Sequence, residues 1–119
     1  MQYLLLIYEN EASSAGLSEA EQGKIFQEYM DYTNRIRKSG NYVGGEALQP
    51  VSTATTVKLK NGKTVTTDGP FAETREQLGG FYMVEAKDLD EAVALAAGIP
   101  AARTGSIEVR PILPTPRPE

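Results

Sequence analysis

The chain has 119 residues and a formal net charge of −4, with no Cys and no His. This length suffices for one domain that buries about two-thirds of the surface its unfolded chain exposes, so folding needs no disulfide or metal ion. The absence of Cys excludes disulfides, thiolate nucleophiles and zinc-finger sites, and the absence of His excludes the usual general base near neutral pH.

The acidic balance also argues against nucleic acid as a partner, because phosphate binding needs clustered basic side chains and the Lys and Arg residues here are scattered. The apolar run at residues 3–8 is far shorter than the ~20 residues of a membrane-spanning helix, and it lacks the basic flank of a signal peptide. We therefore expect a cytoplasmic protein that binds neither nucleic acid nor membranes.

The first half of the chain predicts a strand followed by a long helix. Residues 1–8 form two alternating sets of side chains that are both apolar, the pattern of a strand covered on both faces. Ser18 and Glu21 have the spacing of a capping box, and Ser39 with Gly40 would end the helix. The apolar positions at helical spacing between these limits are Ile25, Phe26, Tyr29, Met30, Thr33 and Ile36.

The middle of the chain predicts a second strand and an inserted hairpin. A strand is expected at residues 41–48, followed by a hairpin whose strands are residues 55–59 and 64–67. The pair Asn61-Gly62 between these strands is the strongest short hairpin signal. After a turn, residues 73–78 predict a short helix.

The second half repeats the strand and helix of the first. Residues 80–86 form another strand that is apolar on both faces, and Asp88 with Glu91 forms a second capping box. The helix that follows would end at Gly98, and its expected inner stripe is Leu89, Ala92, Val93 and Ala96. Residues 106–111 form the last strand, and the Pro-rich tail at 112–119 predicts an extended, exposed segment.

This order of elements is a doubled βαβ pattern, which predicts a ferredoxin-like α+β domain over residues 1–111 with an inserted hairpin. Both helices would then cover one face of a four-stranded sheet, with residues 2–8 and 80–86 as the central strands. Because these strands are apolar on both faces, the face without helices would be a large apolar patch in water. The simplest cover is the same sheet of a second copy, so we expect a homodimer with two-fold symmetry.

Residues 68–96 (DGPFAETREQLGGFYMVEAKDLDEAVALA), together with 106–112 (SIEVRPI) and the opening QYLLLIY, resemble the DGPF or YCII-related domain proteins of bacteria. The resemblance spans nearly the whole chain. It implies a dimeric α+β barrel and a family whose biochemical activity is largely uncharacterised, with relatives found beside or fused to sigma factors of the extracytoplasmic type. It also implies an active site of paired His and Asp, of which only the Asp carries over, onto Asp68.

Asp68 has both a structural and a functional interpretation. In Asp-Gly-Pro its carboxylate can form an Asx-turn, while Gly69 permits unusual dihedral angles and Pro70 fixes the next φ. As a functional group, Asp68 would lie beside the cleft between sheet and helix, where partial burial would raise its pKa toward that of a useful base. We favour the structural interpretation, because carboxylates with shifted pKa values also occur in structural networks.

Two further charged residues are candidates for a catalytic role beside Asp68. Glu46 follows Gly44-Gly45, where a bulge or the close approach of another backbone or a ligand would each explain the glycines, and the bulge is favoured. Arg110 would bind an acidic ligand or hold Asp68 ionised, although a surface or dimer-interface ion pair is the favoured interpretation.

The aromatic residues divide between core and candidate pocket. Tyr29 and Tyr82, with Gly69 and Pro70, are the candidate ligand-binding residues, although tyrosines at such spacing more often lie in the core with a satisfied hydroxyl. The same core interpretation applies to Tyr32 and Tyr42. Phe71 is expected to pack the turn onto the body.

Three functions fit these observations, and the sequence leaves open whether the protein is an enzyme. The first is binding or proton-transfer chemistry on a small polar metabolite in the sheet–helix cleft, with Asp68 as the acid or base. The second is an accessory regulatory module that binds a sigma-factor-related protein. The third is a stable dimer whose cleft is filled by side chains. We expect no cofactor and no metal ion, because scattered carboxylates suit only weak Mg²⁺ or Ca²⁺ binding.

Overall fold

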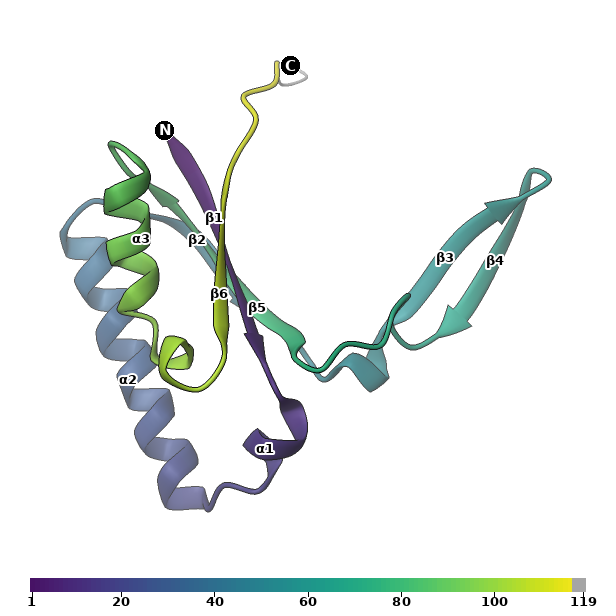
Figure 1. The fold of residues 1–119 in the computed structure, drawn as a ribbon, viewed down its shortest axis with the longest axis horizontal. Coiled ribbons are helices and arrows are strands. Elements are labelled where there is room, and N and C mark those ends of the chain that lie inside the picture. The colour runs from purple at the N-terminus through teal and green to yellow at the C-terminus, as the bar shows by residue number, and fades with distance from the viewer. Residues whose placement is uncertain (117–119) are drawn as a thin grey trace.

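The computed structural model describes residues 1–116 and has a four-stranded antiparallel sheet at its centre (Figure 1). The order of the strands across the sheet is β2-β5-β1-β6. Their bounds are Gln2–Glu9 for β1, Tyr42–Ala47 for β2, Gln77–Glu85 for β5 and Ser106–Pro111 for β6. This order is that of a ferredoxin-like α+β domain, so the predicted fold and its two central strands are confirmed.

Two long helices, α2 (Glu19–Lys38) and α3 (Leu89–Ala97), lie side by side on one face of this sheet (Figure 1). The Tyr32 hydroxyl joins them by donating to the carbonyl of Leu95 at 2.6 Å. The shorter helical segments are α1 (Glu11–Ala15), η1 (Val51–Thr53) and η2 (Pro100–Arg103). Both crossovers therefore place their helices on the same side, as predicted, and leave the other face without a helix.

The starts of the two long helices follow from their caps. Ser18 and Glu21 form the full capping box, in which each side chain bonds the backbone N–H of the other. At α3 only half of the predicted box forms. The Asp88 carboxylate accepts the Glu91 N–H at 2.9 Å, but the Glu91 carboxylate accepts the N–H of Lys87 rather than that of Asp88.

The core lies between the helices and the sheet, and the helix residues that it contains differ in part from those predicted from helical spacing. In α3 Leu89 and Val93 are exposed, whereas the alanines at 92 and 96 are buried. In α2 Phe26 and Met30 are exposed. The buried hydrophobic set is Tyr3, Leu5, Ile7, Tyr32, Ile36, Tyr82, Val84, Ala86, Ala92, Ala96, Ile99 and Ala101. Small side chains therefore let α3 approach the sheet closely, whereas α2 contributes the large side chains of Tyr32 and Ile36 to the core.

The inserted hairpin forms an arm of two strands, β3 (Thr55–Lys60) and β4 (Lys63–Asp68), that projects away from the body (Figure 1). Asn61 and Gly62 both have positive φ, as a two-residue hairpin turn of this kind requires. The predicted hairpin is thus confirmed. The predicted short helix at 73–78 is wrong, because Gln77 already pairs with Glu9 as the first residue of β5.

The face of the sheet that carries no helix is apolar along its centre. Leu4 pairs with Met83, Leu6 with Phe81, and Tyr8 with Leu78, so these six side chains share that face. We call the face of the sheet on which these six side chains lie the bare face. All six are half-buried in the single chain. The prediction that both central strands are apolar front and back therefore holds in three dimensions.

The chain leaves the sheet after β6. Ile112 still donates its N–H to the carbonyl of Gln2, and residues 113–116 form neither helix nor strand. The remainder of the predicted tail, residues 117–119, lies outside the described residues. Among residues 1–116, no helix combines the length and the apolar character that crossing a bilayer requires.

Candidate functional site

A cleft of about 460 Å³ opens between α2 and the β2–β5 side of the sheet. It exists because only the second half of α2 packs closely, where Tyr32 and Ile36 are buried. In the first half Phe26 is 66% exposed and stands over the cleft as one of its walls. The cleft is lined by Ile7, Glu9, Phe26, Tyr29, Thr33, Tyr42, Gly45, Glu46, Ala47, Gly79, Gly80, Phe81 and Tyr82.

The polar groups of the cleft form a directed chain of hydrogen bonds. The Thr33 hydroxyl donates to the carbonyl of Tyr29 at 2.8 Å and lies 2.7 Å from the Tyr82 hydroxyl. Because Thr33 has one proton and uses it on the carbonyl, Tyr82 must be the donor in the second bond. The lone pairs of the Tyr82 oxygen thus remain free to accept a bond from a ligand.

Glu9, at the end of β1, is the carboxylate of the cleft. It accepts a hydrogen bond from the Thr104 hydroxyl at 3.0 Å, and it has no ion-pair partner among residues 1–116. Burial, and after it the charge of Glu9, raises the pKa of Tyr29 to about 12. Tyr29 therefore stays a neutral phenol at physiological pH and can donate a hydrogen bond.

Glycines let the two strands beneath the cleft approach each other. A Cβ atom at Gly45 would lie 2.8 Å from the carbonyl oxygen of Phe81, and one at Gly80 would lie 2.8 Å from that of Glu46. The register of β2 also shifts between Tyr42 and Gly44, so an irregularity lies just before the Gly-Gly pair, while Gly45 itself is explained by the close approach of another backbone.

The predicted ligand-binding tyrosines both line this cleft, and the predicted charged residues do not gather around it. Glu46 borders the cleft, but it pairs with Phe81, so its side chain lies on the bare face. Arg110 lies on β6, at the opposite edge of the sheet, about 14 Å from β2 at three strand spacings. Its guanidinium contacts Glu108 at 3.6 Å in an exposed ion pair.

Asp68 ends β4 at the base of the arm and does not line the cleft. The Asx-turn interpretation fails, because residue 70 is Pro70, which has no N–H, and the Asp68 carboxylate forms no hydrogen bond within residues 1–116. The turn is held instead by Gly69, whose φ is +96° and whose N–H bonds the carbonyl of Ala54 at 2.7 Å. Phe71 is 86% exposed, so it does not pack the turn onto the body.

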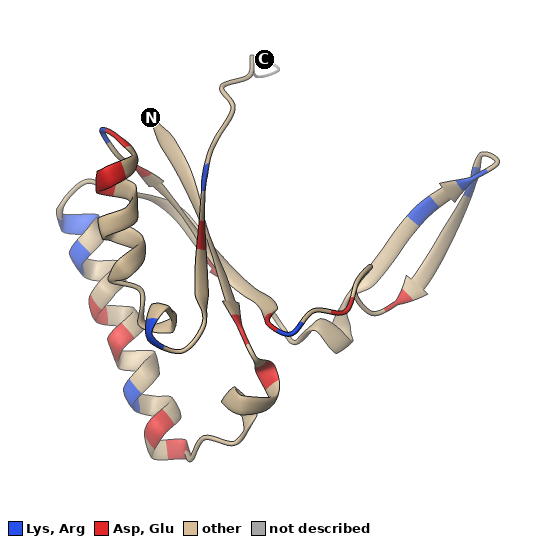
Figure 2. Cartoon of the chain, in the orientation of Figure 1, with Lys and Arg blue, Asp and Glu red and all other residues tan. Residues whose placement is uncertain are grey.

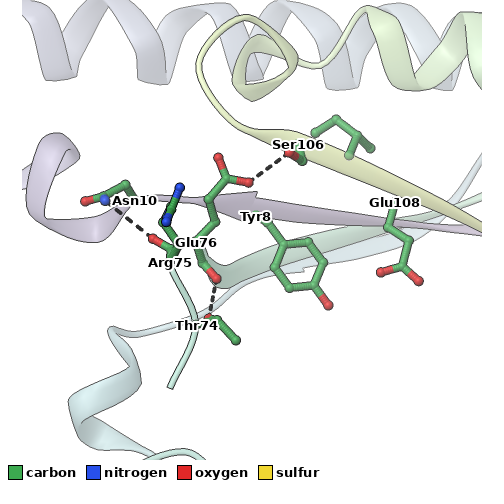
Figure 3. Close-up of a pocket in the computed structure, with 8 residues that line it drawn as sticks. Tyr8, Asn10, Thr74, Arg75, Glu76, Ser106 and Glu108 are labelled. Carbon is green, nitrogen blue, oxygen red and sulfur yellow. Dashed lines mark hydrogen bonds between the residues drawn. The ribbon is translucent and has the colours of Figure 1, made fainter. Parts of the chain in front are cut away.

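Two more hollows flank the segment that follows this turn. One, of about 880 Å³, lies between the body and the base of the arm and includes Pro70 and Phe71 in its lining. The other, of about 720 Å³, is open and polar (Figure 3). In it the Glu76 carboxylate accepts the Ser106 hydroxyl at 2.8 Å, beside the ring of Tyr8. Its remaining lining residues are Asn10, Thr74, Arg75, Ile107 and Glu108.

The sequence interpretation missed Glu9, Phe26 and Thr33 as residues of the cleft. A signal for Glu9 exists, since it is the first charged residue after an apolar strand and therefore emerges at the strand's end. Phe26 and Thr33 recur at helical spacing, so the sequence alone does not distinguish them from the residues of α2 that lie in the core. Within residues 1–116, no three acidic side chains converge as a metal site would require.

Comparison with known proteins places the chain in a family. The model of the YCII-related domain matches residues 1–116. The protein belongs to the YCII-related domain family. A relative, an uncharacterised protein of Rhizobium meliloti (strain 1021), is 35% identical over 114 residues, which cover 94% of this chain and 92% of the relative. The YCII-related assignment therefore covers the cleft, the arm and the bare face alike.

Proposed function

We propose that this YCII-related protein binds a small polar metabolite in the cleft between α2 and the sheet. The observation that carries the proposal is the cleft itself, which combines an apolar wall, Phe26, with the hydroxyls of Tyr29 and Tyr82. Its volume falls in the range of about 300–1,000 Å³ that is usual for small-molecule sites, and mixed apolar and hydroxyl linings are typical of them.

The test is a metabolite library screened by thermal shift against the wild type and Ala47→Leu. Ala47 lines the cleft, is exposed and pairs with Gly80 on the helix side of the sheet, so a larger side chain there fills the cleft without entering the core. Ala12→Leu, at an exposed position of α1, is the matched control. A compound that stabilises the wild type and the control but not Ala47→Leu supports the proposal. Compounds that stabilise all three equally would contradict it.

Asp68 could act as an acid or base in the cleft only if a second copy of the chain supplied it. In one chain Asp68 lies on the two-stranded sheet of the arm, so a partner's arm would have to bring it to a cleft. Asp68→Asn in the same screen tests this idea. A ligand that stabilises Asp68→Asn as much as the wild type would remove Asp68 from the binding site.

The homodimer is supported by the bare face. Its six half-buried apolar side chains form a continuous strip along the two central strands, and soluble monomers rarely expose a strip of this kind. Both edges of the strip are polar, with Glu46 on β2 and the Glu108–Arg110 pair on β6. An apolar centre inside a polar rim is the usual composition of a protein interface.

A second candidate function, binding of a sigma-factor-related protein, is favoured by the arm. An isolated two-stranded hairpin is marginally stable in water, and Val57, Leu59 and Val65 on this arm are all exposed. The arm also carries three lysines and one aspartate, Lys58, Lys60, Lys63 and Asp68, in a chain of net charge −4 (Figure 2). A partner with an acidic, apolar surface would fit it.

The experiment replaces residues 56–67 by Gly-Gly, because Thr55 and Asp68 are neighbours across the arm and a short link can join them. Binding to an extracytoplasmic-type sigma factor is then measured by biolayer interferometry. Loss of binding in the shortened chain supports this function. An undiminished signal, or none with the wild type, contradicts it.

A further inference from the structure

We propose that the cleft between α2 and the sheet selects an organic cation, a small molecule with an ammonium group attached to an apolar body. This inference rests on the proposed function and specifies its ligand. It follows from three features of the cleft: an unpaired carboxylate, aromatic walls, and the absence of a free cation among the described residues that line it.

The carboxylate is Glu9. Its one side-chain hydrogen bond within residues 1–116 comes from the neutral hydroxyl of Thr104, and it forms no ion pair with a Lys or Arg there. A bound ammonium group would supply a counter-charge and several hydrogen-bond donors to this half-buried carboxylate. The position of Glu9 in the lining of the cleft makes that charge available to a ligand.

The aromatic walls favour the same charge. Phe26, Tyr29, Tyr42 and Tyr82 all line the cleft, and the face of an aromatic ring attracts cations. One of these rings already has a cation beside it: the guanidinium of Arg37, which does not line the cleft, lies 4.6 Å from the ring centre of Tyr42. Phe26 and Tyr29 have no such partner among residues 1–116, which leaves their rings for a ligand.

An anion would find little to hold it. Within the part of the chain that the structure describes, residues 1–116, no Lys or Arg lines the cleft. Arg103 lies close enough to Tyr29 to oppose the rise of its pKa, but both ends of its guanidinium are engaged by Glu28, at 2.8 and 3.0 Å. The protons of Thr33 and Tyr82 are used within the chain of hydrogen bonds, so Tyr82 presents lone pairs. Of the polar groups in the cleft, Tyr29 can donate a hydrogen bond, whereas Glu9 and Tyr82 accept, so charge and most of the hydrogen-bonding capacity favour a ligand that donates.

The experiment compares benzylammonium, benzyl alcohol and benzoate, which share one apolar body and differ in charge. Each is titrated into the ¹⁵N-labelled wild type and followed by amide shifts of residues lining the cleft. We expect the cation to bind about tenfold more tightly than the alcohol, because the aromatic rings and the carboxylate of Glu9 both favour a positive charge. Benzoate should bind most weakly. Glu9→Gln, which keeps an oxygen for Thr104, should reduce the ratio of cation to alcohol affinity to about threefold, the part that the aromatic rings supply, and leave alcohol binding unchanged.

Two controls separate this inference from the proposed function. Glu19→Gln removes an exposed carboxylate from the first turn of α2 and should preserve the cation preference. Ala47→Leu should weaken binding of all three probes. If the probes bind, are weakened by Ala47→Leu and show equal affinity, or if benzoate binds best, the cleft remains a binding site and the cation inference is overturned. If no probe shifts the cleft amides at millimolar concentration, both proposals fail.

Discussion

Tyr32→Phe tests whether the contact between the two helices has the energy that its geometry indicates. The Tyr32 side chain is 2% exposed, and its hydroxyl donates to the carbonyl of Leu95 at 2.6 Å. Phenylalanine keeps the ring and its packing and removes only this hydrogen bond. We expect the free energy of unfolding to fall by about 1 kcal/mol at pH 8, the usual net worth of one such bond.

Alkaline pH gives the same substitution a second, opposite effect. Burial, and then interaction with Tyr82, raises the pKa of Tyr32 above the value of about 10 expected in the unfolded chain. Above pH 10 the unfolded chain loses this proton and the folded chain keeps it, so the wild type loses stability as pH rises, by about 1.4 kcal/mol per pH unit for this group. The variant lacks the group. The two stabilities should therefore converge and cross between about pH 10.5 and 11.

Urea denaturation followed by circular dichroism at pH 8, 9.5, 10.5 and 11 measures both effects. The other tyrosines titrate in both proteins, so their contributions cancel in the difference between wild type and variant. A difference that stays constant from pH 8 to 11 would refute the argument, because it would mean that Tyr32 ionises alike in the folded and unfolded chains.

Three further substitutions test the local geometry by urea denaturation. Gly80→Ala should lower the free energy of unfolding by about 1–3 kcal/mol, because its Cβ would lie 2.8 Å from a backbone carbonyl of β2. The control Gly79→Ala, whose Cβ would have nothing within 4 Å, should lower it by less than about 0.5 kcal/mol. Equal effects would contradict the close approach of the strands. Ser18→Ala should cost about 1 kcal/mol through loss of the capping box, and no loss would show that α2 starts elsewhere. Thr33→Val should cost about 1–2 kcal/mol because it leaves the Tyr82 hydroxyl without its partner; an unchanged midpoint would mean that this bond does not form.

Most of the fold could be predicted from the sequence because its strongest signals are local. The capping residues Ser18 and Asp88 mark the helix starts within one residue, and Asn61-Gly62 marks the arm. The continuous apolar runs of β1 and β5 also predicted the central strands, because a strand covered on both faces has apolar side chains at successive positions.

The buried face of α3 could not be predicted, because helical periodicity alone does not distinguish adjacent stripes. Ala92 and Ala96 face the sheet, while the larger Leu89 and Val93 point outward. Ile99, just after α3, is buried in the same core as these alanines, and this tertiary packing is not visible in the local pattern of the sequence.

The candidate site was predicted only in part, for a similar reason. The tyrosines at 29 and 82 reach the cleft because their elements were placed correctly. Asp68, predicted to lie beside the cleft, does not line it, because the arm that it ends forms a separate two-stranded sheet. How far a hairpin projects depends on contacts that no short segment of sequence specifies.

We propose different roles for the two faces of the sheet: the helix side would bind a ligand in the cleft, and the bare face would bind a second copy of the chain. Sedimentation equilibrium of the wild type and Leu6→Glu tests this division most directly, because Leu6 lies in the middle of the bare face. We predict twice the chain mass of 12.9 kDa for the wild type and the single mass for Leu6→Glu, with the far-ultraviolet spectrum of a folded chain in both. A wild type that sediments at the single mass at every concentration would contradict the account.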